Sequence, residues 1–306
     1  MEMKEELLTM SDGVILDSYF MEPPGTPRGH IHLVHGMAEH IGRYEEVMND
    51  LSHAGYVVTG FNQRGHGQRS LDQNQLGDFG EGVTFDRLVE DVREVMDAFK
   101  IEHPNLPRIL FGHSMGSFVV RRFSQKYGAE IDALICSGTA GKPGLTRVGG
   151  SLLASILSIK DGPHAPSVVL DTLGFGGYNK TISHPKTKFD WLSTDRQIVH
   201  NYIEDPLCGT VSTNSFFHVL FDGLKVISTT SNYESVPKKL PILLFAGTED
   251  PVGNMGSGIF EAAEIYRDAG VENATVYLFE GVRHESLQGP SREPVLNMMK
   301  QWVANL

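Results

Sequence analysis

The sequence predicts an α/β protein with a mostly parallel sheet, and two observations support that prediction. Short apolar runs alternate along the chain with longer amphipathic stretches, which is typical of strands joined by helices. The chain has 306 residues, 40% of them hydrophobic and 21% charged, which is the composition of a globular protein with a substantial core. The apolar runs place strands at 31–35, 56–61, 108–112, 133–137, 241–246 and 275–280.

The residues before the first of these strands predict a β-hairpin, with strands at 5–10 and 14–21 joined by Ser11-Asp12-Gly13. Helices are expected between the later strands. In the stretch 115–127, apolar residues recur at steps of three and four, as one buried helix face requires. The other expected helices cover 44–54, 85–103, 258–270 and 294–305.

The alternation is interrupted between residues 139 and 231. This segment carries glycine clusters at 149–150 and 174–177 and apolar patches at 152–159 and 216–226. We interpret it as an inserted helical cap that folds over the sheet. The remaining residues, 1–138 and 232–306, then form the core.

A candidate nucleophile lies in the motif GHSMG at 112–116. The predicted strand 108–112 runs into this motif and a predicted helix follows at once, so the serine occupies a sharp strand-to-helix turn. Gly112 and Gly116 remove side chains that would crowd such a turn. Ser114 would also stand at a helix N-terminus, where the helix dipole favours developing negative charge.

A serine hydroxyl is a poor nucleophile at neutral pH and needs a base, which in turn needs an orienting group. Asp250 follows the strand 241–246, with Glu249 as the rival carboxylate, and His284 follows the last strand. Carboxyl ends of parallel strands share one edge of a sheet. We therefore predict that Ser114, Asp250 and His284 are the nucleophile, the orienting acid and the general base.

The strand 31–35 ends in His35-Gly36-Met37, a turn that can present a backbone amide to the same edge. We expect the amides of Met37 and Met115 to form an oxyanion hole. We expect no metal, because His30, His32 and His35 have no further ligand cluster near them in the sequence. Nucleotide cofactors are not expected, since the chain contains neither a P-loop nor a GxGxxG motif.

The formal net charge of −12 argues against a nucleic-acid partner and against electrostatic docking on anionic membranes. Cys136 and Cys208 stand in no metal-type spacing and are expected to be free thiols, which fits a reducing compartment. The first residues lack a basic segment followed by an apolar stretch. A cytoplasmic protein is therefore expected. The sequence does not indicate its oligomeric state.

These motifs together resemble the bacterial monoacylglycerol lipase and lysophospholipase-like branch of the α/β-hydrolases, the serine aminopeptidase S33 type. The segment HGMAEH at 35–40 with Arg43-Tyr44 resembles that branch's H-G-x-x-E-H…R-Y signature, RGHG at 64–67 resembles its G-H-G loop, and GHSMG matches its elbow. The resemblance covers about 5–138 and 236–306. Asn62, where the branch usually has Asp, and Ser117, where glycine is common, depart from the pattern.

The resemblance implies a serine hydrolase that cleaves lipid-like monoacyl esters through an acyl-enzyme. Apolar cap residues are the candidates to bind the acyl chain or touch a lipid surface, although packing of the cap would use the same residues. Two alternatives stay open: an aminopeptidase of the same fold, with Asp190, Asp195, Glu204 and Asp205 as candidate amine-binding acids, and a ligand-binding homologue of low turnover. The proposed acyl-binding residues are Phe175, Phe216, Phe217 and Leu220.

Overall fold

The computed structural model describes residues 2–100, 103–141 and 145–306, and the side chains of 145–149 are left out of the description. Within these ranges the chain forms one eight-stranded sheet, in the order β1-β2-β4-β3-β5-β6-β7-β8. The β1–β2 and β2–β4 pairs are antiparallel, and the other pairs are parallel. The strands are β1 (Lys4–Thr9), β2 (Ile15–Met21), β3 (Gly29–Val34), β4 (Tyr56–Phe61), β5 (Arg108–His113), β6 (Ala133–Ser137), β7 (Ile242–Gly247) and β8 (Ala274–Phe279).

The prediction of a mostly parallel sheet is confirmed, and β4 and β6 begin and end at the predicted residues. The predicted helix at 115–127 is α4. The helices are α1 (Glu45–His53), α2 (Gly67–Asp72), α3 (Phe85–Lys100), α4 (Met115–Tyr127), α5 (Leu145–Asp161), α6 (Val168–Phe175), α7 (Arg196–Glu204), α8 (Asn214–Ile227), α9 (Ser257–Asp268) and α10 (Arg292–Ala304). Short 3₁₀ turns are η1 (Ile41–Tyr44), η2 (Gly128–Glu130), η3 (Tyr178–Thr181), η4 (Thr230–Tyr233) and η5 (Gly289–Ser291). The short helix α2, which follows the RGHG segment, was not predicted.

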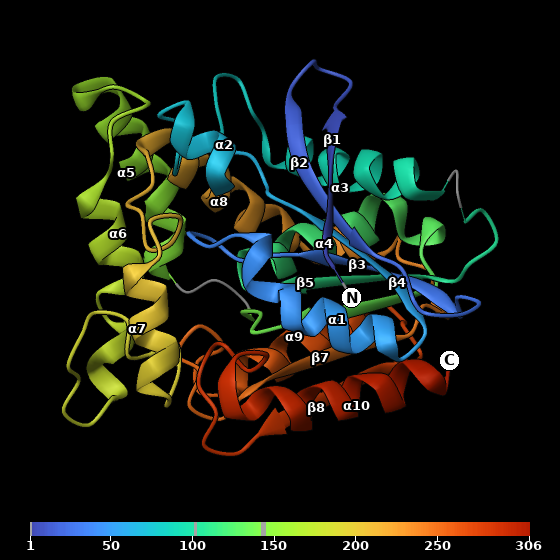
Figure 1. The fold of residues 1–306 in the computed structure, drawn as a ribbon. Helices are drawn as coiled ribbons and strands as arrows, with labels where there is room; N and C mark the ends of the chain where they lie inside the picture. Colours follow the sequence, from blue (N-terminus) through green and yellow to red (C-terminus); the bar gives the residue numbers. More distant parts are fainter. Residues whose placement is uncertain (1, 101–102, 142–144) are drawn as a thin grey trace.

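Helices cover both faces of the sheet (Figure 1). On one face, α1 and α10 pack against apolar side chains of β3, β5 and β7. On the other face, α3, α4 and α9 form a larger cluster with the opposite side chains of the same strands. Both faces of the central strands are therefore mainly apolar, as parallel strands covered on two sides require, and the buried His30 and His32 of β3 are exceptions.

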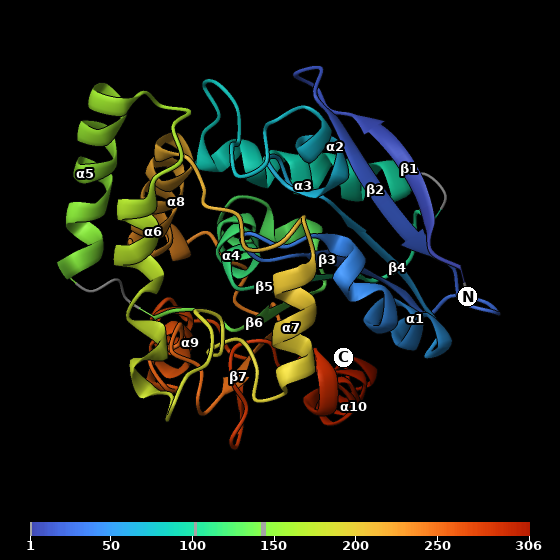
Figure 2. The same cartoon turned by 60° about the vertical axis from the view of Figure 1, so that its left-hand side comes forward.

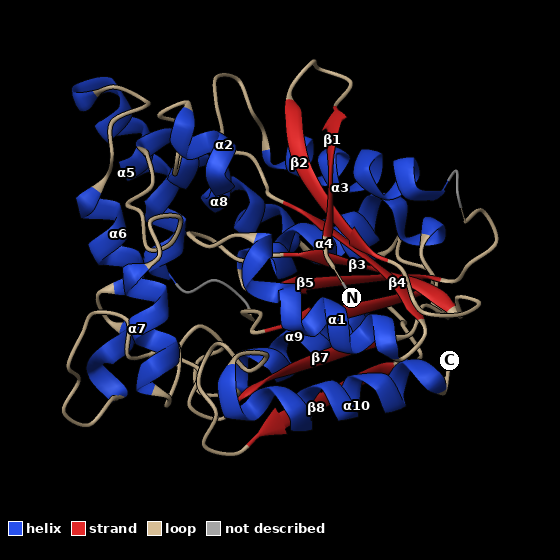
Figure 3. Ribbon diagram, in the orientation of Figure 1, coloured by secondary structure: helices blue, strands red, loops and turns tan. Residues whose placement is uncertain are grey.

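The part of the segment between β6 and β7 that the structure describes contains four α-helices, and they lie in two places. In Figures 1 and 2, α5, α6 and α7 lie off one end of the central strands, not on either face of the sheet. The last helix, α8, packs against α3 and α4, and Gly223 lies directly against the ring of Phe85. The colouring in Figure 3 shows that the described residues of this segment form helices and loops and contribute no strand to the sheet.

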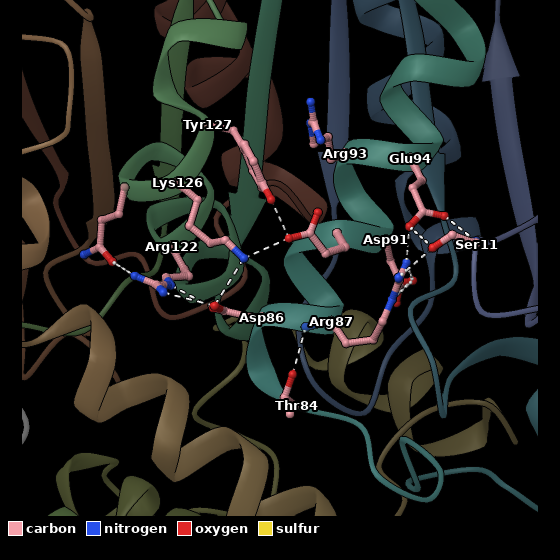
Figure 4. A network of polar contacts seen from close by, with 12 residues as sticks. Ser11, Thr84, Asp86, Arg87, Asp91, Arg93, Glu94, Arg122, Lys126 and Tyr127 are labelled. Atoms are coloured by element: carbon pink, nitrogen blue, oxygen red, sulfur yellow. Dashed lines mark hydrogen bonds and ion pairs between the residues drawn. The ribbon is translucent and has the colours of Figure 1, made fainter.

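Ionic and hydrogen bonds join α3 to its neighbours (Figure 4). Arg87 of α3 bonds to Asp91 at 2.7 Å, and also to Glu94 and to Ser11 in the β1–β2 turn. Lys126 at the end of α4 reaches Glu90 at 2.8 Å. Among the described residues, every helix is too short or too polar to cross a bilayer.

Candidate active site

Ser114 occupies the turn between β5 and α4 in a backbone conformation that serine rarely adopts, with φ 51° and ψ −120°. The turn is possible because each of its two glycines packs so closely against backbone atoms that no Cβ would fit. A Cβ on Gly112 would collide with the Gly116 carbonyl, and a Cβ on Gly116 would collide with the Val34 carbonyl. The Ser114 amide donates to the Ser137 carbonyl of β6 at 2.9 Å, which fixes the turn to the sheet.

His284 and Asp250 are hydrogen-bonded. His284 Nδ1 lies 2.9 Å from Asp250 Oδ1 and 3.0 Å from Oδ2, and both side chains are buried. Burial alone would lower the pKa of His284, but the Asp250 carboxylate beside it raises that pKa above the ordinary 6.5. The hydrogen bond occupies Nδ1 and leaves Nε2 as the ring nitrogen available to a second partner.

The structure separates the two carboxylates that were rivals in the sequence. Asp250 is fully buried, and its Oδ1 also accepts from the Val252 amide at 2.9 Å, so the carboxylate is fixed toward His284. Glu249 instead points to Arg283, 3.4 Å away, and is 45% exposed. Only Asp250 therefore meets His284.

A second imidazole lies against His284 but is not equivalent to it. The His113 ring centroid is 4.7 Å from that of His284, and His113 Nδ1 is 3.1 Å from Ser137 Oγ. Burial and the neighbouring His284 lower the pKa of His113 to about 3, so His113 stays neutral. Trp191 also contacts His284, with ring centroids 5.1 Å apart. The inserted segment therefore touches the His284 loop directly.

The loop after β3 is fixed on both sides of Met37. The Gly36 amide donates to Glu39 Oε1 at 2.6 Å, and the Ala38 amide donates to His66 Nε2 at 3.2 Å. Burial lowers the pKa of His66 to about 4, so the ring is neutral and can accept at Nε2 while Nδ1 bonds to the Arg64 carbonyl. The RGHG segment thus supports the loop that carries Met37.

A buried ionic network, which sequence reasoning missed, joins this loop to the His284 loop. Arg43 donates to Glu39 Oε2 at 2.7 Å and forms a two-bond pair with Glu285, at 2.5 and 2.8 Å. Burial alone would raise the pKa of Glu39, but the Arg43 guanidinium holds it below its ordinary value. The HGMAEH…RY motif includes Glu39 and Arg43, but nothing in it indicates Glu285 as the partner of Arg43.

Two cavities meet at Ser114. The smaller, of about 230 Å³, contains polar groups and is also lined by Met37, His284, Asp171 and Lys188. The larger, of about 700 Å³, is mainly apolar. Both cavities are lined by Ser114, Met37 and Phe175, and the larger one by Met115 as well. Other residues around the larger cavity are Phe118, Leu153, Leu170, Leu173, Phe221, Leu224 and Val252.

Three of the four predicted acyl-binding residues line a cavity beside Ser114. Phe175 lines both, and Phe217 and Leu220 line the larger one. Phe216 lies elsewhere: its ring stacks on Phe79 with centroids 3.9 Å apart, and its side chain is fully buried. Phe216 therefore does not line either described cavity at Ser114, because neighbouring positions on a helix point about 100° apart.

The other sequence candidates make structural contacts. His30 and His32 both bond to Thr59 Oγ1, at 2.6 and 2.7 Å. None of the four acids proposed for amine binding is among the residues lining the two described cavities at Ser114. Asp190 accepts from Thr187, Asp195 caps α7, Asp205 bonds to His40, and Glu204 lies 4.0 Å from His200.

Both departures from the family pattern have partners. Asn62 Oδ1 accepts from the Ile41 amide at 3.0 Å, and the Asn62 side chain packs under Gly67. Ser117 Oγ donates to the Ser114 carbonyl at 2.5 Å. Both side chains therefore support loops next to Ser114 and leave the Asp250–His284 contact intact.

Known proteins that are similar to this chain include monoacylglycerol lipases and a carboxyl esterase. A monoacylglycerol lipase of Mycolicibacterium smegmatis is 27% identical over 92% of this chain and 90% of its own length. The human monoglyceride lipase is 26% identical over 90% of this chain and 82% of its own. The crystal structure of a carboxyl esterase from Bacillus coagulans in complex with glycerol superposes with a TM-score of 0.93, at 26% identity, over 100% of this chain and 99% of that one.

The family model described as serine aminopeptidase, S33 matches residues 25–291, which include all of β3 to β8 and the segment inserted between β6 and β7. The α/β-hydrolase arrangement of the sheet agrees with that match. The chain therefore belongs to the serine aminopeptidase S33 family of α/β-hydrolases.

Proposed function

We propose that this protein is a serine ester hydrolase that cleaves monoacyl lipids, such as monoacylglycerols or lysophospholipids, through an acyl-enzyme on Ser114. The observation that carries the proposal is the apolar cavity of about 700 Å³ that opens at Ser114. A cavity of this size accommodates one acyl chain. The relatives named as monoacylglycerol lipases support the same substrate class.

The roles of the side chains follow from their environments. Ser114 Oγ attacks the acyl carbonyl carbon while His284 Nε2 accepts its proton, and Asp250 stabilises the imidazolium that forms. The amides of Met37 and Met115 bind the oxyanion. His284 then returns the proton to the leaving alcohol oxygen, and the ester bond breaks. Water, activated by the same histidine, releases the fatty acid and restores Ser114.

The two cavities suggest how the substrate is oriented. We assign the apolar cavity to the acyl chain and the smaller cavity, with Asp171 and Lys188, to the polar alcohol. The glycerol named in the Bacillus coagulans esterase complex is an alcohol of the kind this assignment requires. A substrate with one long chain and one small polar group uses both cavities.

We further propose that residues 139–231 form the cap of the enzyme, with α8 anchoring it to the core. The cap covers the site from the carboxyl ends of the strands, because Phe175 and Trp191 line the smaller cavity together with Ser114. On its outer side α5 and α6 expose apolar residues, which suit peripheral contact with a neutral lipid surface. These residues are Leu152, Ile156, Ile159, Val168 and Val169.

The test uses p-nitrophenyl esters of graded chain length and a monoacylglycerol, on the purified protein and on Ser114→Ala. We expect kcat/KM to rise from acetate to medium or long chains, and we expect Ser114→Ala to lose at least about 10³-fold. A fluorophosphonate should label Ser114, as mapped by mass spectrometry. Unchanged activity in Ser114→Ala would refute the mechanism, and a preference for acetate would refute the lipid substrate. Hydrolysis of aminoacyl nitroanilides in place of esters would favour the aminopeptidase alternative.

A further inference from the structure

Three metal-ligating side chains meet where the loop after β3 touches the inserted segment. His40 Nε2, Asp205 Oδ2 and Cys208 contribute ligand atoms that lie within 4.8 Å of one another, with His40 Nε2 and Asp205 Oδ2 2.8 Å apart. His40 follows Glu39 in the loop. Asp205 and Cys208 belong to the turn after α7, which is closed by a hydrogen bond from the Cys208 amide to the Asp205 carbonyl at 3.0 Å.

The geometry points to a binding site for one Zn²⁺-type ion, held by the imidazole of His40, the carboxylate of Asp205 and the thiolate of Cys208. Nitrogen, oxygen and sulfur donors are the set that zinc takes, with bonds of about 2.0–2.3 Å. A tetrahedral ion with such bonds separates its ligand atoms by about 3.3–3.8 Å. The His40–Asp205 contact is shorter than this spacing, so binding of the ion requires side-chain rotations that open it. Water completes the fourth position.

Cys208 lies beside the carboxylate of Asp205, which already bonds to His40 at 2.8 Å. The ion displaces the thiol proton to solvent and replaces the hydrogen bond between His40 and Asp205. The side chains of His40 and Asp205 are 16% and 28% exposed, so the site borders the solvent.

The site is next to the proposed oxyanion loop. The Ala38 carbonyl accepts from the Gly209 amide at 2.9 Å and from the Tyr202 hydroxyl at 2.8 Å. Gly209 directly follows Cys208, and Ala38 directly follows Met37. An ion that joins His40 to Cys208 therefore bridges the same two segments that these hydrogen bonds join. It should hold the inserted segment and the Met37 loop in one fixed arrangement.

The experiment titrates Co²⁺ into the full chain, reduced and free of any polyhistidine tag. We expect one cobalt ion per chain, with a thiolate-to-cobalt charge-transfer band in the near ultraviolet that Zn²⁺ abolishes by displacement. Cys208→Ser should remove the band, and His40→Ala and Asp205→Asn should each weaken binding at least about tenfold. Cys136→Ser is the matched control, because Cys136 is the fully buried thiol of β6, and it should keep the band.

The same samples give a second readout, the melting temperature. Zn²⁺ should raise it in the parent and in Cys136→Ser, and not in Cys208→Ser, because an ion that binds only the native state stabilises that state. A charge-transfer band that persists in Cys208→Ser, or a parent protein that binds cobalt no more tightly than Asp205→Asn, would overturn the proposal. Circular dichroism confirms that each variant is folded. Neither readout requires ester hydrolysis, so the site is tested separately from the proposed function.

Discussion

At the scale of single residues, two opposing effects set the protonation of His284. Burial removes water from the imidazole and disfavours its charged form, whereas the Asp250 carboxylate at 2.9 Å favours that form. The carboxylate prevails and the pKa is raised. His113, at a similar depth but without such a partner, has its pKa lowered to about 3. The two neighbouring imidazoles therefore have pKa values shifted in opposite directions, because only His284 is hydrogen-bonded to a carboxylate.

This difference predicts the pH dependence of turnover. His284 accepts the Ser114 proton only when neutral, and its raised pKa means that it becomes protonated above the ordinary 6.5. We expect kcat/KM to fall as the pH drops through a value above 6.5. Asp250→Asn should lower kcat/KM by about 10⁴-fold. In the activity that remains, the fall of kcat/KM on the acidic side should shift to lower pH. A stopped-flow or plate-reader pH series measures kcat/KM and the pH at which it falls. If that pH is the same in Asp250→Asn as in the parent, the role of Asp250 is contradicted.

Arg43 is a second residue whose replacement we expect to lower the free energy of unfolding strongly. It is the shared partner of two buried carboxylates, Glu39 and Glu285, each with 4% of its side chain exposed. Arg43→Ala should lower the free energy of unfolding by about 3–5 kcal/mol, because it leaves buried charges unpaired. Urea unfolding followed by circular dichroism measures this. Arg93→Ala, which breaks the exposed pair with Glu130, is the control and should cost about 1 kcal/mol or less.

At the scale of elements, the β5–α4 turn depends on close approach of backbone to backbone. The turn carries Ser114 at a positive φ and starts α4 immediately, so α4 lies against the end of β3. Glycine at 116 permits this approach, because its Cα faces the Val34 carbonyl. Met115 directly precedes Gly116, and Met37 follows Val34 by three residues, so this contact lies next to both amides of the proposed oxyanion hole. The geometry of the proposed oxyanion hole is therefore built by two glycines and one strand end.

Gly116→Ala tests this element. The added methyl group should push α4 away from β3, lowering the free energy of unfolding by about 1–3 kcal/mol. Because a displacement of about 1 Å near reacting groups can cost about 10²-fold, kcat/KM should fall by that order. Gly25→Ala is the control, since a Cβ there meets nothing within 4 Å, and it should leave both quantities unchanged. An active and stable Gly116→Ala would show that the turn tolerates a side chain.

At the scale of the whole molecule, the groups proposed to take part in the reaction all lie at one edge of the sheet. Ser114 follows β5, Met37 follows β3, Asp250 follows β7 and His284 follows β8, and all four strands are parallel. The inserted segment lies over that edge and supplies walls for both cavities. The core thus holds the proposed reacting groups, and the insertion shapes what reaches them.

The outer side of the insertion carries a prediction about lipid surfaces. Ile156 and Ile159 of α5 are 52% and 87% exposed. Replacing both by serine should reduce turnover of an emulsified long-chain monoacylglycerol by about tenfold or more, because each buried side chain contributes about 1.5–3 kcal/mol at an apolar surface. Turnover of a soluble butyrate ester should not change. With a net charge of −12, the parent should bind zwitterionic vesicles better than anionic ones.

The matched control for this pair is Phe260→Ser. Phe260 is 48% exposed on α9, a helix outside the insertion, so its loss should affect neither substrate. Vesicle sedimentation measures binding directly, and a pH-stat assay measures turnover of the emulsion. Equal losses on soluble and emulsified substrates in the double variant would mean that these isoleucines stabilise the inserted segment and do not bind lipid.

The strands and the three residues proposed for catalysis could be predicted because each is marked locally. A period of two or an apolar run marks a strand, and the candidate residue follows within a few positions of its end. The inserted segment was harder to predict. Its apolar patches at 152–159 and 216–226 lie on α5 and α8, but only three-dimensional packing decides that Phe217 faces the cavity and Phe216 faces Phe79.

The sequence by itself determined the sheet, the turn at Ser114 and the order of Ser114, Asp250 and His284, because parallel strands bring their carboxyl ends to one edge whatever the loops do. Only the tertiary structure decided which long-range partners meet. Arg43 and Glu285 are 242 residues apart, and His40 and Asp205 are 165 apart. Such contacts depend on how the loops and the insertion pack over the carboxyl ends of the strands, and no local sequence pattern predicts that packing.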